Sequence, residues 1–192
     1  MATIPGAPGD DTLNGTDEAD TITGLGGNDT IRAGGGEDQV DGGDGDGWIF
    51  GGDAHDVLRG GAGDDRIFGQ AGDDCSAGGD GNDRLKGGPG YDELDGGAGD
   101  ATFTPGPGDD VVIGSEAGRD SVSFRSAVQG VTVDLAEGTA SGGARTRSRA
   151  SSSWWAPRST TGCSATTAPT SSTASPATIA SMAAAGATTS TA

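Results

Sequence analysis

Aspartate recurs every nine residues through more than half of this 192-residue chain. Counting from residue 11, twelve positions are nine residues apart; ten are Asp, and Gly47 and Ala101 are the exceptions. Carboxylates are hard oxygen ligands, so a regular row of them favours binding of a hard cation. The ten candidate metal ligands are Asp11, Asp20, Asp29, Asp38, Asp56, Asp65, Asp74, Asp83, Asp92 and Asp110.

The residues around each aspartate repeat with the same period. The residue two places before each of the twelve positions is glycine in ten cases. The residue two places after is apolar in eleven cases, and Ser76 is the exception. Glycine is also frequent at the first two positions of the unit. The repeat is therefore Gly-Gly-x-Gly-x-Asp-x-U-x, where U is a bulky apolar residue, and it is unbroken in residues 60–68 and 78–86.

Elements that position the aspartates follow from this unit. Glycine at three fixed places predicts a tight loop, because such a loop needs positive backbone dihedrals and close approach of another chain. The last three residues alternate outward, inward and outward, as in a short half-buried strand. Two consecutive repeats can close one coil, and coils stacked at the strand spacing of about 4.8 Å bring every second aspartate into register.

This stacking sorts the aspartates into two columns. Without a cation the columns repel themselves, whereas calcium takes six to eight oxygens and can bridge two carboxylates and loop carbonyls. Magnesium demands a tighter octahedron, and no cluster of His or Cys favours zinc or copper. We define the first column as Asp20, Asp38, Asp56, Asp74, Asp92 and Asp110, with five bridging sites, and the second as Asp11, Asp29, Gly47, Asp65, Asp83 and Ala101, with carboxylate pairs only at Asp11/Asp29 and Asp65/Asp83.

Four departures from the repeat bear on these sites. Asp46 and Asp100 lie one residue before the two gaps in the second column, where they could partly substitute for the missing ligands. Glu18 and Ala54 replace a loop glycine, so we expect weaker sites at Asp20 and Asp56.

Composition excludes several classes of protein. The chain has 39 glycines, few aromatic residues and a net charge of -18, which argues against an ordinary hydrophobic-core enzyme. This charge repels nucleic acids and anionic membranes and attracts cations, so we expect no nucleic acid partner. No apolar run is long enough for a transmembrane segment.

We find no catalytic machinery. His55 is the only histidine, and it occupies a loop position where it has no partner for acid–base work. Motifs of metalloproteases, esterases and nucleotide hydrolases are absent, so we predict that the chain is not an enzyme. Trp48 points outward beside Gly47, where it can pack on the roll or stack on a sugar. Cys75 and Cys163 lie far apart in dissimilar contexts, which predicts free thiols.

The repeats resemble the RTX, or hemolysin-type, calcium-binding nonapeptides of proteins exported by Gram-negative type I secretion. The resemblance covers residues 9–113 directly and 114–138 more loosely. It implies an all-β fold, a right-handed parallel β-roll, in which several calcium ions are held by the sixth-position aspartates and backbone carbonyls. It also implies folding that waits for calcium outside the cell, and hence an extracellular location.

Three regions are predicted along the chain. Residues 1–113 form the roll, and residues 114–143 form a capping β segment that includes a strand pair at 121–137. Residues 144–192 contain no acidic residue and are dominated by Ala, Ser and Thr, a composition typical of disorder. Either this tail is a disordered linker, or it is a frameshift product. Reading the codons of Trp154-Trp155 one base earlier yields Val-Gly, and Thr-Thr pairs can yield Asp-Asp in the shifted frame.

Three classes of function remain open at this stage. The first is a calcium-dependent folding and secretion module, with calcium ions and a type I secretion apparatus as its partners. The second is a structural or adhesive module that binds a polysaccharide. The third is the C-terminal fragment of a secreted hydrolase or epimerase.

Overall fold

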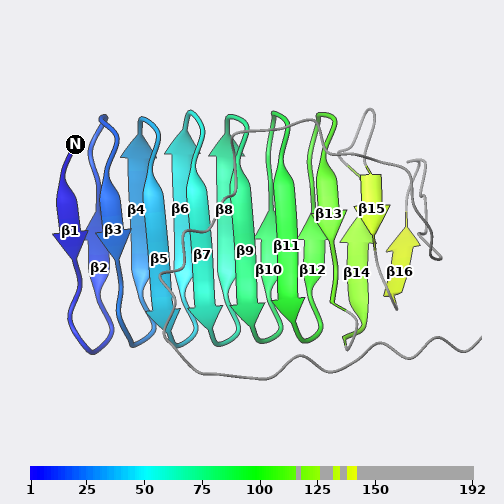
Figure 1. Cartoon of the computed structure of the whole chain (residues 1–192), viewed down its shortest axis with the longest axis horizontal. Coiled ribbons are helices and arrows are strands. Elements are labelled where there is room, and N and C mark those ends of the chain that lie inside the picture. Colours follow the sequence, from blue (N-terminus) through cyan, green and yellow to red (C-terminus); the bar gives the residue numbers. More distant parts are fainter. Residues whose placement is uncertain (116–117, 126–131, 135–137, 142–192) are drawn as a thin grey trace, which may run out of the picture.

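The structure is a computed structural model that describes residues 1–115, 118–125, 132–134 and 138–141. Two parallel sheets face each other along a flattened roll, and the chain passes from one sheet to the other at every strand (Figure 1). One sheet contains β1 (Thr3–Pro5), β3 (Thr21–Thr23), β5 (Gln39–Asp44), β7 (Val57–Ala62), β9 (Cys75–Asp80), β11 (Glu93–Ala98), β13 (Val111–Ile113) and β15 (Thr132–Asp134). The other contains β2 (Thr12–Asn14), β4 (Thr30–Gly35), β6 (Trp48–Asp53), β8 (Arg66–Ala71), β10 (Arg84–Lys86), β12 (Thr102–Thr104), β14 (Asp120–Ser123) and β16 (Gly138–Ser141).

The register of the strands follows the repeat. Ile4 pairs with Ile22 and Ile49 with Ile67, so each strand stacks on the strand two repeats away. Each repeat supplies one loop and one strand because its glycines permit the reversal and its last three residues alternate about the sheet. The predicted all-β parallel roll, with two repeats in each coil, is confirmed.

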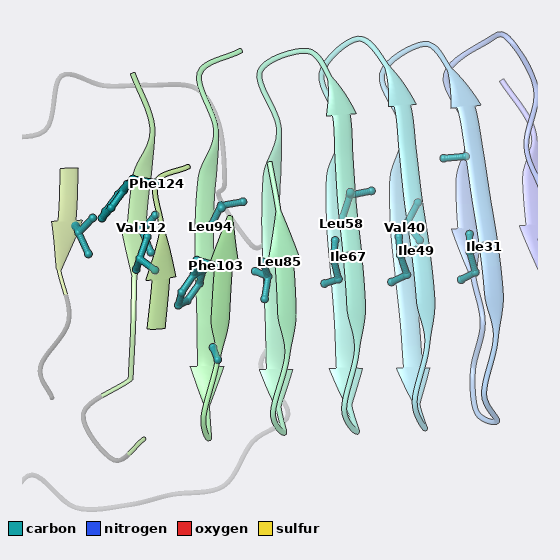
Figure 2. Close-up of a cluster of buried hydrophobic side chains, with 14 of the residues drawn as sticks. Ile31, Val40, Ile49, Leu58, Ile67, Leu85, Leu94, Phe103, Val112 and Phe124 are labelled. Carbon is teal, nitrogen blue, oxygen red and sulfur yellow. The ribbon is translucent and has the colours of Figure 1, made fainter. Parts of the chain in front are cut away.

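A single line of apolar side chains from each sheet fills the interior. Ile31, Ile49 and Ile67 lie in register on one sheet and are fully buried, and Val40 and Leu58 face them from the other (Figure 2). Burial of each such side chain contributes about 2 kcal/mol. The core is only one side chain deep on each sheet. Hydrophobic packing by itself therefore contributes little to the order of the loops.

Two loops that lack the expected glycine behave differently. Ala54 adopts the left-handed conformation of the glycine it replaces, with φ of 83°, and thereby keeps the loop before Asp56 like its neighbours. Glu18 has no positive φ, and its loop is closed instead by hydrogen bonds from Thr16 to Asp20. The departure at residue 18 therefore changes the loop, whereas the departure at residue 54 does not.

The last strands continue both sheets. β14 pairs with β12, and β15 pairs with β13, each in parallel, although the register slips beyond the regular repeats. β14 and β15, which fall in the predicted strand pair at 121–137, thus belong to different sheets, and β16 pairs with β14. The division at residues 113 and 143 stays a prediction, and the predicted tail at 144–192 lies outside the described residues.

Two further expectations concern the membrane and the cysteines. None of the described residues belongs to a helix that is long and apolar enough to span a membrane. The expectation of free thiols is wrong for Cys75, which is buried and disulfide-bonded. Its dissimilar sequence context carried no information about which residues the fold brings near it.

Candidate metal site

The candidate aspartates lie at the ends of the loops, each immediately before a strand. Their side chains point into the roll, on the same side as the apolar residue two positions later. Asp11 is half-buried, and the other nine are almost completely buried, with exposed fractions of 2% or less. Carboxylates are rarely buried in this way unless a partner compensates the lost hydration.

The first column forms an unbroken ladder. The backbone N–H of Asp38 donates to Oδ1 of Asp56 at 2.9 Å, and the N–H of Asp56 donates to Oδ1 of Asp74 at 3.0 Å. The same bond joins every neighbouring pair from Asp20 to Asp110. One oxygen of each carboxylate is thereby fixed, so the other oxygen has a defined direction.

The second column is interrupted at the two predicted gaps. The backbone N–H of Asp11 donates to Oδ1 of Asp29 at 2.8 Å, and the backbone N–H of Asp65 donates to Oδ1 of Asp83 at 2.9 Å. At the far end the N–H of Ala101 donates to Oδ1 of Asp120, which is 1% exposed. The sequence-based assignment missed Asp120 because it follows Asp110 by ten residues instead of nine; the only signal was its glycine two residues earlier.

The second oxygen of most of these carboxylates has no protein partner. A buried polar atom without a hydrogen bond is costly, so eight of them in register call for a ligand that the protein atoms do not supply. Asp11, Asp20 and Asp120 differ, because Oδ2 accepts a hydrogen bond from the backbone of Ala7, Thr16 or Ser115. The eight orphaned atoms are Oδ2 of Asp29, Asp38, Asp56, Asp65, Asp74, Asp83, Asp92 and Asp110.

Glycine at the first position of the repeat makes room for this oxygen. A Cβ on Gly51 would lie 2.5 Å from Oδ2 of Asp56 and 2.7 Å from the carbonyl oxygen of Gly69 in the next coil. A carboxylate oxygen and a carbonyl oxygen therefore converge on the space that the missing Cβ leaves. Oxygen atoms from side chain and backbone are the ligands that calcium prefers.

Substitution of Gly51 should therefore damage the site. We expect Gly51→Ala to destabilise the fold by about 1–3 kcal/mol, because backbone and a fixed carboxylate must both move. Gly9→Ala is the matched control, since a Cβ there meets nothing within 4 Å. Urea denaturation of both variants in calcium measures the difference, and equal midpoints would contradict this role of Gly51.

The two gaps in the second column differ in what lies behind them. Behind Ala101, a Cβ on Gly96 would meet the ring of Phe103 and the methyl group of Ala101, each at 2.7 Å. Behind Gly47, the equivalent Cβ on Gly42 would lie against the carbonyl oxygen of Gly60 and 3.2 Å from Cδ1 of Ile49, the distance at which Cδ1 of Leu58 lies from a Cβ on Gly51 at the intact site. Apolar atoms therefore occupy the position at Ala101, whereas at Gly47 the loop carbonyl remains and only the carboxylate is missing.

Asp46 and Asp100 do not fill the gaps. Both are exposed and belong to a second ladder on the outside of the loops, in which side chains at the fifth repeat position accept backbone N–H groups from the following coil. Asp46 accepts from Asp64 at 2.9 Å, and Asp100 accepts from Arg119 at 2.8 Å. This outer ladder stabilises the loops and directs its side chains away from the interior.

Burial changes the ionisation of the column carboxyls. Loss of hydration, together with repulsion by neighbouring carboxylates, outweighs the hydrogen bond from the backbone. The net effect of burial is to raise the pKa to about 7 for Asp56, Asp65 and Asp92 and to about 6 for Asp74, Asp83 and Asp110. Without a cation, these carboxyl groups therefore bind protons more tightly in the folded chain than in the unfolded chain.

This shift predicts that acid stabilises the metal-free roll. Because the folded pKa lies above the unfolded value near 4, the stabilising effect of protonation is complete below about pH 4 and is lost as the pH rises through 6 to 7. We expect the calcium-depleted chain to gain β structure as the pH falls from 8 to 5, as measured by circular dichroism. A loss of β structure over that range would contradict the raised pKa values.

The described residues contain no group of three or more His, Cys, Asp or Glu side chains arranged to hold one metal ion. Any ion in the columns would therefore take few carboxylates and complete its shell with carbonyl oxygens. An oxygen-only donor set with a single carboxylate contributed by each coil suits calcium better than zinc or copper.

The two parallel sheets and the buried columns of carboxylates are typical of a β-roll that binds cations. The profile of the RTX calcium-binding nonapeptide repeat matches residues 5–40, 41–74 and 77–112, which is more than half of the chain. The chain belongs to this family, and its roll is a calcium-binding domain, not a catalytic one. None of the curated proteins matches the chain.

Proposed function

We propose that the chain is a calcium-dependent folding module of a bacterial protein that leaves the cell by type I secretion. The observation that carries the proposal is the series of eight buried carboxylate oxygens without a protein partner. Such atoms are tolerable in a folded protein when a cation compensates them. In a cytosol poor in calcium the chain stays unfolded and exportable, and it folds in the calcium-rich extracellular medium.

The proposed ligands are the ten sequence-predicted aspartates, and they form seven bridging sites. Five lie in the first column, and two lie at Asp11/Asp29 and Asp65/Asp83 in the second. The site nearest the N-terminus of the first column is weakest, because Oδ2 of Asp20 already accepts hydrogen bonds from the backbone and the hydroxyl of Thr16. Asp38 to Asp110 provide the strongest run.

Isothermal titration of the full chain with calcium tests the proposal. We expect about seven ions per chain at dissociation constants of roughly 10⁻⁴ to 10⁻³ M, as in other extracellular calcium modules. Magnesium at the same concentrations should produce little heat, since it keeps its hydration shell. A chain that binds no calcium at millimolar concentration, or that binds magnesium equally well, would refute the assignment.

The adhesive alternative also has a specific observation in its favour. Cationic and aromatic side chains gather on the outer face of one sheet, over the neighbouring strands β4, β6, β8 and β10. A calcium-folded roll can present such a face to a ligand. The two roles are compatible, because the aspartate columns lie inside the roll and the cationic and aromatic side chains lie on its outside.

A further inference from the structure

The sheet of even-numbered strands, β2 to β16, has two main rows of side chains on its outer face, and neither row contains an acidic residue. Register between neighbouring strands aligns these outward side chains in rows that cross the strands. The first row is Thr12, Thr30, Trp48, Arg66, Arg84, Thr102 and Ser121, and the second is Asn14, Arg32, Phe50, Phe68, Lys86 and Thr104. We call these two rows the cationic face.

Charge is distributed very unevenly between the two sheets. Residues 1–143 contain all 29 acidic residues of the chain and seven basic ones, and four of those seven are on the cationic face. The opposite sheet carries three acidic residues, Asp41, Glu93 and Asp95, and one cation, Arg59, on its corresponding outward rows. The cationic face is thus a local positive surface on a strongly negative protein.

The four cations of this face have no acidic partner. Among the described residues, the only ion pair within 4.0 Å joins the N-terminal ammonium to Glu18. Arg32, Arg84 and Lys86 are exposed, and Arg66 is half-buried. In a chain with so many carboxylates, cations that remain unpaired are available to an external anion.

Aromatic rings hold two of the guanidinium groups in place. The rings of Phe50 and Phe68 stack with centroids 4.9 Å apart and planes within 7° of each other. The guanidinium carbon of Arg66 lies 4.8 Å from the ring centroid of Trp48, and that of Arg32 lies 5.4 Å from the ring of Phe50. Stacking restricts these long side chains and leaves their N–H groups free for a carboxylate.

We propose that the cationic face binds an acidic polysaccharide, a linear chain of uronate sugars that lies across the strands. Adjacent strands are about 4.8 Å apart, so a chain that runs along the rows meets a positive charge on β4, β8 and β10 and aromatic rings on β6 and β8. Uronate carboxylates pair with the cations, and the C–H face of a sugar ring rests on Trp48, which is 41% exposed. A flat sheet with charges in line suits an extended polymer.

Other anionic partners fit this face less well. The phenyl rings are stacked on one another and half-buried, so they do not project as anchors into a bilayer. Nucleic acid has a higher density of negative charge than a uronate chain and is repelled more strongly by the net charge of -18. Each bound calcium offsets two negative charges, so the inference rests on the proposed calcium function.

Titration of the full chain with hexagalacturonate in millimolar calcium tests the inference. The methyl ester of the same hexasaccharide is the matched ligand, because it keeps the sugar backbone and lacks the carboxylates. We expect the acid to bind and the ester to bind weakly, and we expect affinity to fall as salt is raised. The double substitution Arg66→Gln with Arg84→Gln should weaken binding by about tenfold.

Arg59→Gln is the matched protein control, since Arg59 lies on β7 in the opposite sheet. Its affinity for hexagalacturonate should equal that of the unmodified chain. Circular dichroism of the same samples shows whether each variant folds in calcium, which separates failure of this surface from failure of the calcium module. A folded chain that binds the ester as well as the acid, ignores the double substitution, or instead binds phosphatidylserine vesicles through Arg66 and Arg84 would overturn the inference.

Discussion

Removal of calcium is expected to abolish the β structure of the repeats, and millimolar calcium is expected to restore it. At a tenfold excess over the dissociation constant, each site adds about 1.4 kcal/mol to the stability of the folded state. Seven sites together add about 10 kcal/mol, which is comparable with the whole stability of an ordinary domain. The thin core and the buried carboxylates leave the metal-free roll without a compensating source of stability at neutral pH.

Far-ultraviolet circular dichroism during a calcium titration measures this transition. We expect a cooperative rise in β signal, because each coil stacks on its neighbours and each ion joins two coils. Magnesium at the same ionic strength is the control, and it should leave the chain largely unfolded. Identical spectra in chelator and in calcium would exclude calcium-dependent folding.

Asp74→Asn should have effects of opposite sign with and without calcium. Asparagine keeps the shape of the side chain and an oxygen that can accept the N–H of Asp56, but it carries no charge. In calcium the variant should lose the two bridging sites that share Asp74, or about 3 kcal/mol at a tenfold excess of calcium. In chelator it should be more stable than the unmodified chain, because a buried charge with a pKa of about 6 is gone.

Asp73→Asn provides the control for this prediction. Asp73 is the neighbouring residue, but it is exposed, and its Oδ1 accepts the N–H of Tyr91 at 2.7 Å in the outer ladder. Asparagine preserves that acceptor, so little change is expected in either condition. Urea denaturation of both variants in calcium, and in chelator the pH at which β structure appears as the pH is lowered, give the four values. If Asp74→Asn destabilised the chain equally in both conditions, its role would be structural and not that of a metal ligand.

Much of the fold was predictable because the repeat is local and highly regular. Ile49 and Ile67 show why: each is the large inward residue of its repeat, and their spacing of 18 residues equals one coil. Hydrophobic alternation therefore determined the faces, and the loop glycines determined where the chain reverses. The interior position of the column aspartates follows from the same alternation, two residues before the apolar side chain.

Other features of the site depended on contacts between coils. The sequence alone could not show that Phe103 packs into the gap at Ala101, because that depends on the volume that Gly96 leaves free. Asp46 looked like a substitute ligand, yet its place one residue earlier in the loop turns it outward. Asp120 joined the second column only through a slip in register after the regular repeats.

The sequence by itself determined the period, the two parallel sheets and the two columns in which the aspartates line up, because alternation and glycine placement act over a few neighbouring residues. Only the tertiary structure decided which carboxylate oxygens are left without a partner and which outward residues gather into the cationic face. Both depend on the pairing of residues 18 positions apart, where small differences in loop length and side-chain volume decide which atoms meet.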